Sequence, residues 1–119
     1  MGDFRKLAVW QKAYQLTLNI YQATGSFPKE ELFGMTSQMR RAAASIPANI
    51  AEGSGRGGDV ELRRFCQIAL GSANELEFFA LLSRDLRYLE AQQYDQLNEY
   101  ILEIQRMLGS LIQKLGTKS

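Results

Sequence analysis

The chain has 119 residues, of which 45% are hydrophobic and 23% charged, with a formal net charge of +1 and no histidine. This length suits one domain, so we predict a single domain over residues 1–119. No apolar stretch approaches the roughly 18 residues of a membrane span, and the N-terminal segment lacks the apolar core of a signal peptide. The lack of histidine excludes Ser-His-Asp and Cys-His catalysis and nearly all zinc sites. We therefore expect a cytoplasmic protein with no enzymatic activity, cofactor, metal or membrane partner.

Residues 4–24 are predicted to form the first helix, because apolar residues recur three and four positions apart. The row expected to face the core comprises Leu7, Trp10, Tyr14, Thr17 and Tyr21. Ala13, Leu16 and Ile20 widen this row into a stripe. Gly25 is well placed to stop the helix.

Residues 33–52 carry the same helical spacing and are predicted to form the second helix. Pro47 lies inside it, where a proline removes one hydrogen bond and clashes with the carbonyl four residues earlier. Because Ile46 and Ile50 keep the spacing, we expect a kink near Ala43 rather than an end. Gly53 is expected to close the helix.

Residues 59–86 are predicted to form a long third helix with a heptad-like apolar row. Its middle contains the small residues Gly71, Ser72 and Ala73, which predict a notch where a neighbouring helix approaches closely. The large apolar residues of this helix point in several directions; they are Phe65, Phe78, Phe79, Leu81 and Leu82. Either this helix is covered on two sides within its own bundle, or other subunits cover it, and we favour self-association.

The fourth predicted helix, residues 91–115, shows the strongest pattern in the chain. Its apolar residues keep alternating spacings of four and three; they are Leu97, Ile101, Ile104, Leu108, Leu111 and Leu115. Residues 116–119 are expected to be a disordered tail. Four helices with short connections predict an all-α protein, an antiparallel up-down-up-down four-helix bundle.

Three features invite a chemical interpretation that the sequence does not support. Residues 53–58 have the spacing G-x-G-x-x-G, but a helix precedes them instead of the strand that a dinucleotide site needs. We therefore expect a flexible interhelical loop. The carboxylate pairs Glu75/Glu77 and Glu99/Glu103 have no histidine to complete a di-metal site. Cys66 is expected to be a small buried residue rather than a nucleophile.

Arginines give the main candidate site, since a cluster of guanidinium groups binds phosphates through charge and bidentate hydrogen bonds. The candidate nucleic-acid-binding residues are Arg40, Arg41, Arg56, Arg63 and Arg64. Antiparallel neighbouring helices could bring several of them together. The alternative is a solvated surface, or salt bridges to Glu52, Asp59 and Glu61.

Several motifs make the chain similar to the four-helix-bundle family of 23S rRNA intervening-sequence proteins. These motifs include Phe27-Pro28, the run 36–43, Ser45-Ile46-Pro47-Ala48-Asn49-Ile50-Ala51-Glu52-Gly53, Ile68-Ala69-Leu70-Gly71-Ser72 and Glu75-Leu76. The chain departs from the family pattern at Met35 and Met39, where leucine is common, and at Gly57-Gly58, which makes the loop more flexible than is usual in the family. The resemblance implies a barrel-like homopentamer. It also implies kinship with the basic accessory protein of diversity-generating retroelements, which binds a reverse transcriptase and nucleic acid.

The sequence thus leads to two functional hypotheses. The first is a non-enzymatic homo-oligomeric adaptor, a pentamer by the family resemblance, that binds RNA or other nucleic acid through the five arginines. The alternative is a protein-interaction scaffold or accessory subunit, for example of a reverse transcriptase, with no direct nucleic-acid role.

Overall fold

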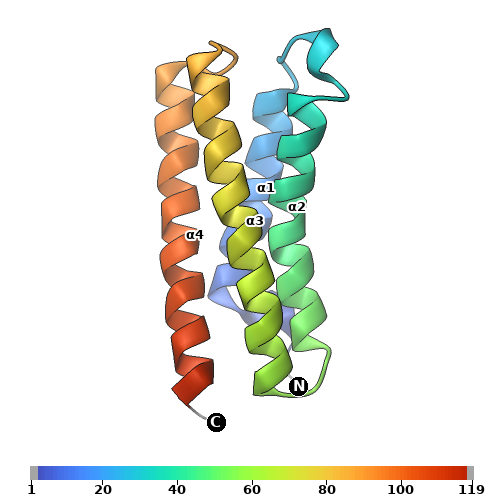
Figure 1. Cartoon of the computed structure of the whole chain (residues 1–119), viewed down its shortest axis with the longest axis vertical. Helices are drawn as coiled ribbons and strands as arrows, with labels where there is room; N and C mark the ends of the chain where they lie inside the picture. The colour runs from blue at the N-terminus through green and yellow to red at the C-terminus, as the bar shows by residue number, and fades with distance from the viewer. Residues whose placement is uncertain (1–2, 118–119) are drawn as a thin grey trace.

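The computed structural model describes residues 3–117, which form four α-helices and no strand (Figure 1). The α-helices are α1 (Ala8–Thr24), α2 (Met35–Ser54), α3 (Asp59–Asp85) and α4 (Ala91–Thr117), and two short 3₁₀ helices are η1 (Phe4–Lys6) and η2 (Lys29–Glu31). The described part of the chain is a rod of 46 × 22 × 19 Å. The predicted all-α class is confirmed.

Each α-helix packs against its neighbours in the chain, and α4 also packs against α1. Within residues 3–117 the diagonal pairs, α1 with α3 and α2 with α4, make no direct backbone approach. The α1–α2 and α3–α4 connections lie at one end of the rod and the α2–α3 connection at the other (Figure 1). The four helices therefore surround one central core.

Several helix boundaries differ from the predicted ones; α2 begins at Met35 rather than at residue 33, and α3 ends at Asp85 rather than at residue 86. The predicted first helix is divided, because Leu7 has extended backbone angles between η1 and α1. Gly53, expected to end the second helix, lies inside α2, which continues to Ser54. Gly116 and Thr117, expected in a tail, belong to α4, and residues 118–119 lie outside the described part. Pro47 is buried within α2, and the kink expected there stays a prediction.

The core is built from small and medium aliphatic side chains of all four helices. From α4 it takes Leu97, Ile101, Ile104, Leu108 and Leu115, which are members of the predicted heptad row. From α1 it takes Val9, Ala13, Leu16 and Ile20, and the polar Thr24 is buried at the end of the same helix. The row predicted to face the core on α1 was therefore misplaced, since Tyr14 and Tyr21 are about half exposed.

Close helix approach occurs at a different glycine from the predicted one. Gly71 is exposed, and a Cβ atom added there would meet no atom within 4 Å. A Cβ on Gly53 would lie 2.7 Å from Phe65 Cβ and 3.2 Å from Leu62 Cα, so α2 and α3 converge at this position. The notch prediction was wrong for Gly71, because this residue is on the outer side of α3.

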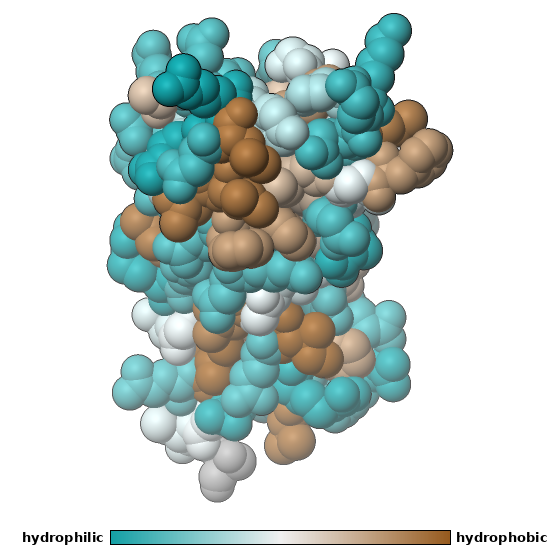
Figure 2. Space-filling view, turned by 45° about the horizontal axis from the view of Figure 1, so that its top comes forward, coloured by the Kyte–Doolittle hydropathy of each residue, from teal (hydrophilic) through white to brown (hydrophobic). Residues whose placement is uncertain are grey.

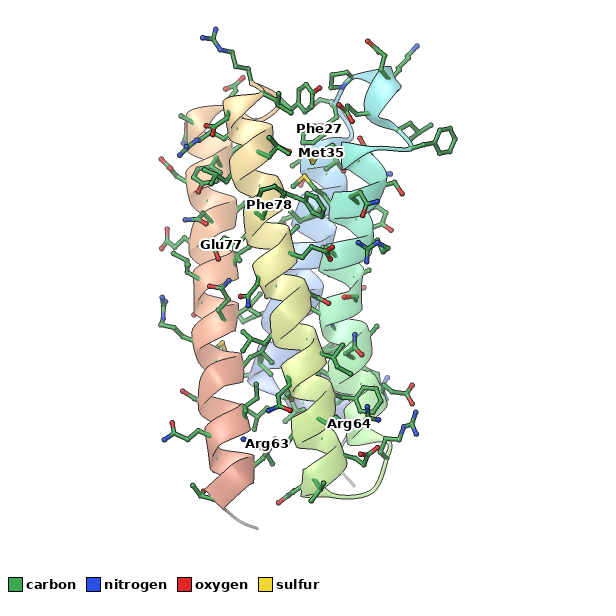
Figure 3. All side chains as sticks on the ribbon, in the orientation of Figure 1. Phe27, Met35, Arg63, Arg64, Glu77 and Phe78 are labelled. Atoms are coloured by element: carbon green, nitrogen blue, oxygen red, sulfur yellow. The ribbon has the colours of Figure 1, made fainter. Side chains whose placement is uncertain are left out.

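A polar contact ties the two connections at one end of the bundle. The Glu31 carboxylate accepts a hydrogen bond from the Met35 backbone N–H at 2.9 Å and one from the Tyr88 hydroxyl at 2.8 Å. Both hydrogen bonds lower the pKa of Glu31, the one from Met35 more than the one from Tyr88. The hydrogen bond between Tyr88 and Glu31 also raises the pKa of Tyr88. Tyr88 also packs on Phe27, with ring centroids 5.4 Å apart. Phe27 and Met35 are labelled at this end in Figure 3.

Candidate interaction surfaces

The five candidate arginines do not form one cluster. Arg40 and Arg41 lie in the first half of α2, whereas Arg56, Arg63 and Arg64 lie around the α2–α3 connection. Along α2 the two groups are roughly 20 Å apart at 1.5 Å per residue. This separation exceeds the distance of about 8 Å over which exposed charges act at physiological salt. The structure therefore divides the predicted site into two separate groups.

Arg40 is half-buried and bonds to groups of α1. Its Nε donates a hydrogen bond to Thr24 Oγ1 at 2.9 Å, and a terminal nitrogen donates to the Tyr21 carbonyl at 3.2 Å. The guanidinium also lies 4.6 Å from the centroid of the Tyr21 ring. The second bond supplies a partner to the Tyr21 carbonyl near the C-terminal end of α1, where helix carbonyls lack intrahelical partners. Arg40 thus has a structural use that the sequence did not reveal.

Arg41 bridges α2 and α3 from the surface. It donates to Gln38 Oε1 at 2.8 Å and to Glu75 Oε2 at 3.2 Å. Both partners of the ion pair are well exposed, and such pairs contribute at most about 1 kcal/mol to stability. Arg41 can therefore exchange Glu75 for another anion at small cost.

Two arginines at the α2–α3 connection share one aromatic ring. The guanidinium groups of Arg56 and Arg64 lie 5.1 and 4.5 Å from the centroid of the Phe65 ring. Arg56 pairs with Glu52 at 2.8 Å and Arg64 with Glu61 at 3.1 Å. The hydrogen bond from Arg64 lowers the pKa of Glu61. The two guanidinium groups are partly exposed and oriented by the ring, which makes this pair the best-formed cationic feature of the five residues.

Arg63 points to the other side of α3, toward the end of α4 (Figure 3). Its Nε donates to the Ile112 carbonyl at 3.0 Å, so it joins the start of α3 to the last turns of α4. A Cβ added at Gly116 would lie 2.9 Å from this Nε, which shows how closely the arginine packs there. Like Arg40, Arg63 is half-buried and used within the fold.

Large apolar side chains on the surface form a second kind of feature. Tyr14, Leu18 and Tyr21 make an exposed row on α1, 46–48% accessible, and we call it the α1 row. Phe78 and Leu81 are exposed on α3, as is Ile68 about 15 Å away along the helix, and we call these three residues the α3 row. Figure 3 labels Phe78 on α3, and Figure 2 shows hydrophobic residues on the surface in both halves of the molecule, with the larger brown area in the upper half.

Sequence reasoning anticipated an excess of apolar surface on the third helix and a double apolar row on the first, but it assigned Tyr14 and Tyr21 to the core and did not single out Leu18. The residue type could have indicated that the α1 row is exposed, because tyrosine is found at half-exposed positions more often than alanine or isoleucine. Phe33, in the connection between η2 and α2, is 91% exposed and was also missed. It falls outside any periodic pattern.

The remaining candidates for chemistry, apart from Glu99, are occupied or inaccessible. Glu77 accepts a hydrogen bond from Gln105 at 2.8 Å, and Glu103 pairs with Lys12 at 3.2 Å. Within residues 3–117 no three acidic or cysteine side chains gather as a metal site would require. Cys66 is buried, and burial raises the pKa of its thiol to about 11, which disfavours the reactive thiolate. None of the helices in this range is long and apolar enough to cross a bilayer.

Fold and surface together define a histidine-free, all-α four-helix protein whose exposed features are apolar rows and arginines. The chain belongs to the 23S rRNA-intervening sequence protein family, whose model matches residues 5–110. A similar solved structure is a protein of unknown function from the S23 ribosomal protein family of Bacteroides thetaiotaomicron. It is 29% identical with a TM-score of 0.79, over 88% of this chain and 98% of that one. A comparison with curated proteins found no match.

Proposed function

We propose that the protein is a non-enzymatic cytoplasmic adaptor that self-associates through the α1 row and the α3 row. The observation that carries this proposal is the exposure of both rows, with Phe78 57% accessible on α3. Exposed apolar patches of this kind mark sites of protein–protein contact. Burying both rows between copies would remove them from water.

The position of the two rows favours one kind of assembly. Because α1 and α3 lie on a diagonal of the bundle, the two rows belong to different sides of one copy. Two copies that join the α1 row of one to the α3 row of the other form a heterologous contact, which closes into a ring when the rotation permits. A ring of five copies, implied by the family resemblance, is consistent with this contact.

Mixing variants tests the proposal directly. Size-exclusion chromatography with light scattering should give a defined oligomer for the unmodified chain. Leu18→Glu and Phe78→Glu should each prevent ring closure, and an equimolar mixture of the two should form a heterodimer through the one intact pair of rows. Leu32→Glu is the matched control, because Leu32 is also about half exposed but lies outside both rows. A monomer at all concentrations of the unmodified chain would contradict self-association.

RNA binding is a second candidate function, favoured by Arg56 and Arg64 on the shared Phe65 ring. Arginine planes held in this way can meet phosphates or stack on bases. A ring would repeat the pair around its axis and so raise the local positive charge. The modest net charge of +1 makes this a local effect rather than one of the whole molecule.

Fluorescence anisotropy with a structured RNA at several salt concentrations tests this second candidate. The double variant Arg56→Ala/Arg64→Ala should weaken binding and reduce the slope of log affinity against log salt by roughly 1 to 2. Arg84→Ala is the control, because Arg84 pairs with Asp85 at the opposite end of α3. An affinity for RNA that does not change with salt concentration, or no binding at low salt, would contradict a role in RNA binding. A protein partner retained after nuclease treatment would instead support the scaffold hypothesis.

A further inference from the structure

A polar groove separates α1 from α4 and is not used by either proposed function. It has a volume of about 680 Å³, within the range of small-molecule sites. Six of its ten lining residues end in an amide or a carboxylate. Its α1 residues include Lys12 and Asn19, which form a different row along the helix from Tyr14, Leu18 and Tyr21. We call this feature the α1–α4 groove.

One part of the α1–α4 groove already holds an alkylammonium group of the chain itself. Lys12 Nζ lies 3.2 Å from Glu103 Oε1 and 5.7 Å from the centroid of the Tyr100 ring. A carboxylate and an aromatic face are the two groups that attract a primary ammonium, by ion pairing and by the cation–π interaction. Glu103 and Tyr100 thus form an ammonium subsite with an internal occupant.

A second carboxylate in the groove has no such occupant. Glu99 precedes Glu103 by one turn of α4, a rise of about 6 Å along the axis. Within residues 3–117 Glu99 has no ion-pair partner. The amide of Gln96, three residues earlier on the same helix, and that of Gln22 on α1 also line the groove and can accept hydrogen bonds.

We propose that the α1–α4 groove binds a linear aliphatic polyamine. One ammonium group pairs with Glu99, and the methylene chain lies along the Tyr100 ring. A second ammonium group competes with Lys12 for Glu103, since the spacing of one helical turn between the carboxylates suits two amines joined by a short chain. The amides of Gln96 and Gln22 accept hydrogen bonds from the amine that reaches them. The proposal is independent of self-association, because the groove and the α1 row occupy different sides of α1.

Titration of the full chain with putrescine and spermidine tests the proposal, using calorimetry for affinity and ¹⁵N chemical shifts for location. Saturable binding with shifts confined to α1 and α4 is expected. Glu99→Gln should weaken binding roughly fivefold, the size of effect expected for an ion pair at a partly exposed site. Asp95→Asn is the matched control, because Asp95 is exposed on the same helix and does not line the groove. It should leave the affinity unchanged.

The variant Lys12→Met gives the most decisive test, because it removes the lysine ammonium group that competes with the polyamine for Glu103 and Tyr100. It should tighten spermidine binding roughly fivefold, whereas Lys29→Met, the same charge change outside the groove, should not. The neutral analogue 1,4-butanediol should not bind. No saturable binding, equal effects of Glu99→Gln and Asp95→Asn, or no gain in Lys12→Met over Lys29→Met would each overturn the proposal.

Discussion

The α2–α3 pair and the α1–α4 pair of the same bundle pack in different ways. Between α2 and α3 small residues allow close contact: Gly53 of α2 lies against Phe65 of α3, and Ser45 Oγ donates a hydrogen bond to Ser72 Oγ. Between α1 and α4 long polar side chains, such as Lys12 and Glu103, line a groove. The distance between packed helices depends on the side chains at the contact. The comparison shows how one chain makes a close structural contact and an open groove with the same fold.

The largest effect is expected from filling the close contact. Gly53→Ala should destabilise the protein by about 1–3 kcal/mol, because overpacking forces Phe65 or the α3 backbone at Leu62 to move. Urea unfolding followed by circular dichroism measures the change. Gly109→Ala is the control, since a Cβ at Gly109 would meet no atom within 4 Å. Equal behaviour of the two variants would show that α2 and α3 are not in tight contact at this glycine.

Gly71, on the outer side of α3, provides the counterpart to Gly53 at the contact with α2. Gly71→Ala should stabilise the protein by up to about 1 kcal/mol, because alanine favours the helix and a Cβ there meets open space. The same urea experiment measures the gain. Loss of stability would mean that Gly71 faces a neighbouring helix after all, as the sequence suggested.

The contact between Glu31 and Tyr88 joins the two connections and so links the two helix pairs at one end. Because the folded-state pKa of Glu31 lies below its ordinary value of 4.5, its stabilising contribution is complete above that value. It is lost as the pH falls through the folded-state pKa. Thermal melts between pH 7 and pH 3 should show that the melting temperature falls more steeply with decreasing pH in the unmodified chain than in Glu31→Gln. Glu30→Gln, one residue away, should keep the steep fall in melting temperature. If this control variant lost the pH dependence, the dependence could not be assigned to Glu31.

The smallest effect is expected in the groove. Lys12→Met should change the free energy of unfolding by less than about 0.5 kcal/mol, because an exposed ion pair contributes little. Chemical denaturation of this variant beside Gly53→Ala gives the contrast between the two helix pairs directly. A loss comparable with that of Gly53→Ala would show that the groove residues support the fold.

Much of the fold could be predicted because each helix has its own local signal. The alternating spacing from Leu97 to Leu115 fixed both the existence of α4 and its buried side. The boundaries were less certain, since Gly53 resembles a stop signal in sequence but is retained in α2 for its lack of a side chain. On α1, two apolar rows compete, and periodicity alone did not show which one faces the core.

The candidate site was harder to predict, because arginines close in sequence are used in different ways. Arg63 and Arg64 are adjacent, yet one reaches the α4 backbone and the other lies over the ring of Phe65. Successive residues on a helix point about 100° apart, so neighbours in sequence face different helices. Only the packing partners distinguish an arginine that serves the fold from one that is available to a ligand.

The sequence by itself determined the all-α class, the four helical segments and the lack of histidine chemistry, since these depend on composition and on local periodicity. The tertiary structure decided which glycine admits a neighbouring helix, which apolar rows stay in water, how the arginines divide and where α1 and α4 leave a groove. These features depend on contacts between residues far apart in the chain, and the distance and rotation of packed helices arise only when all four are together.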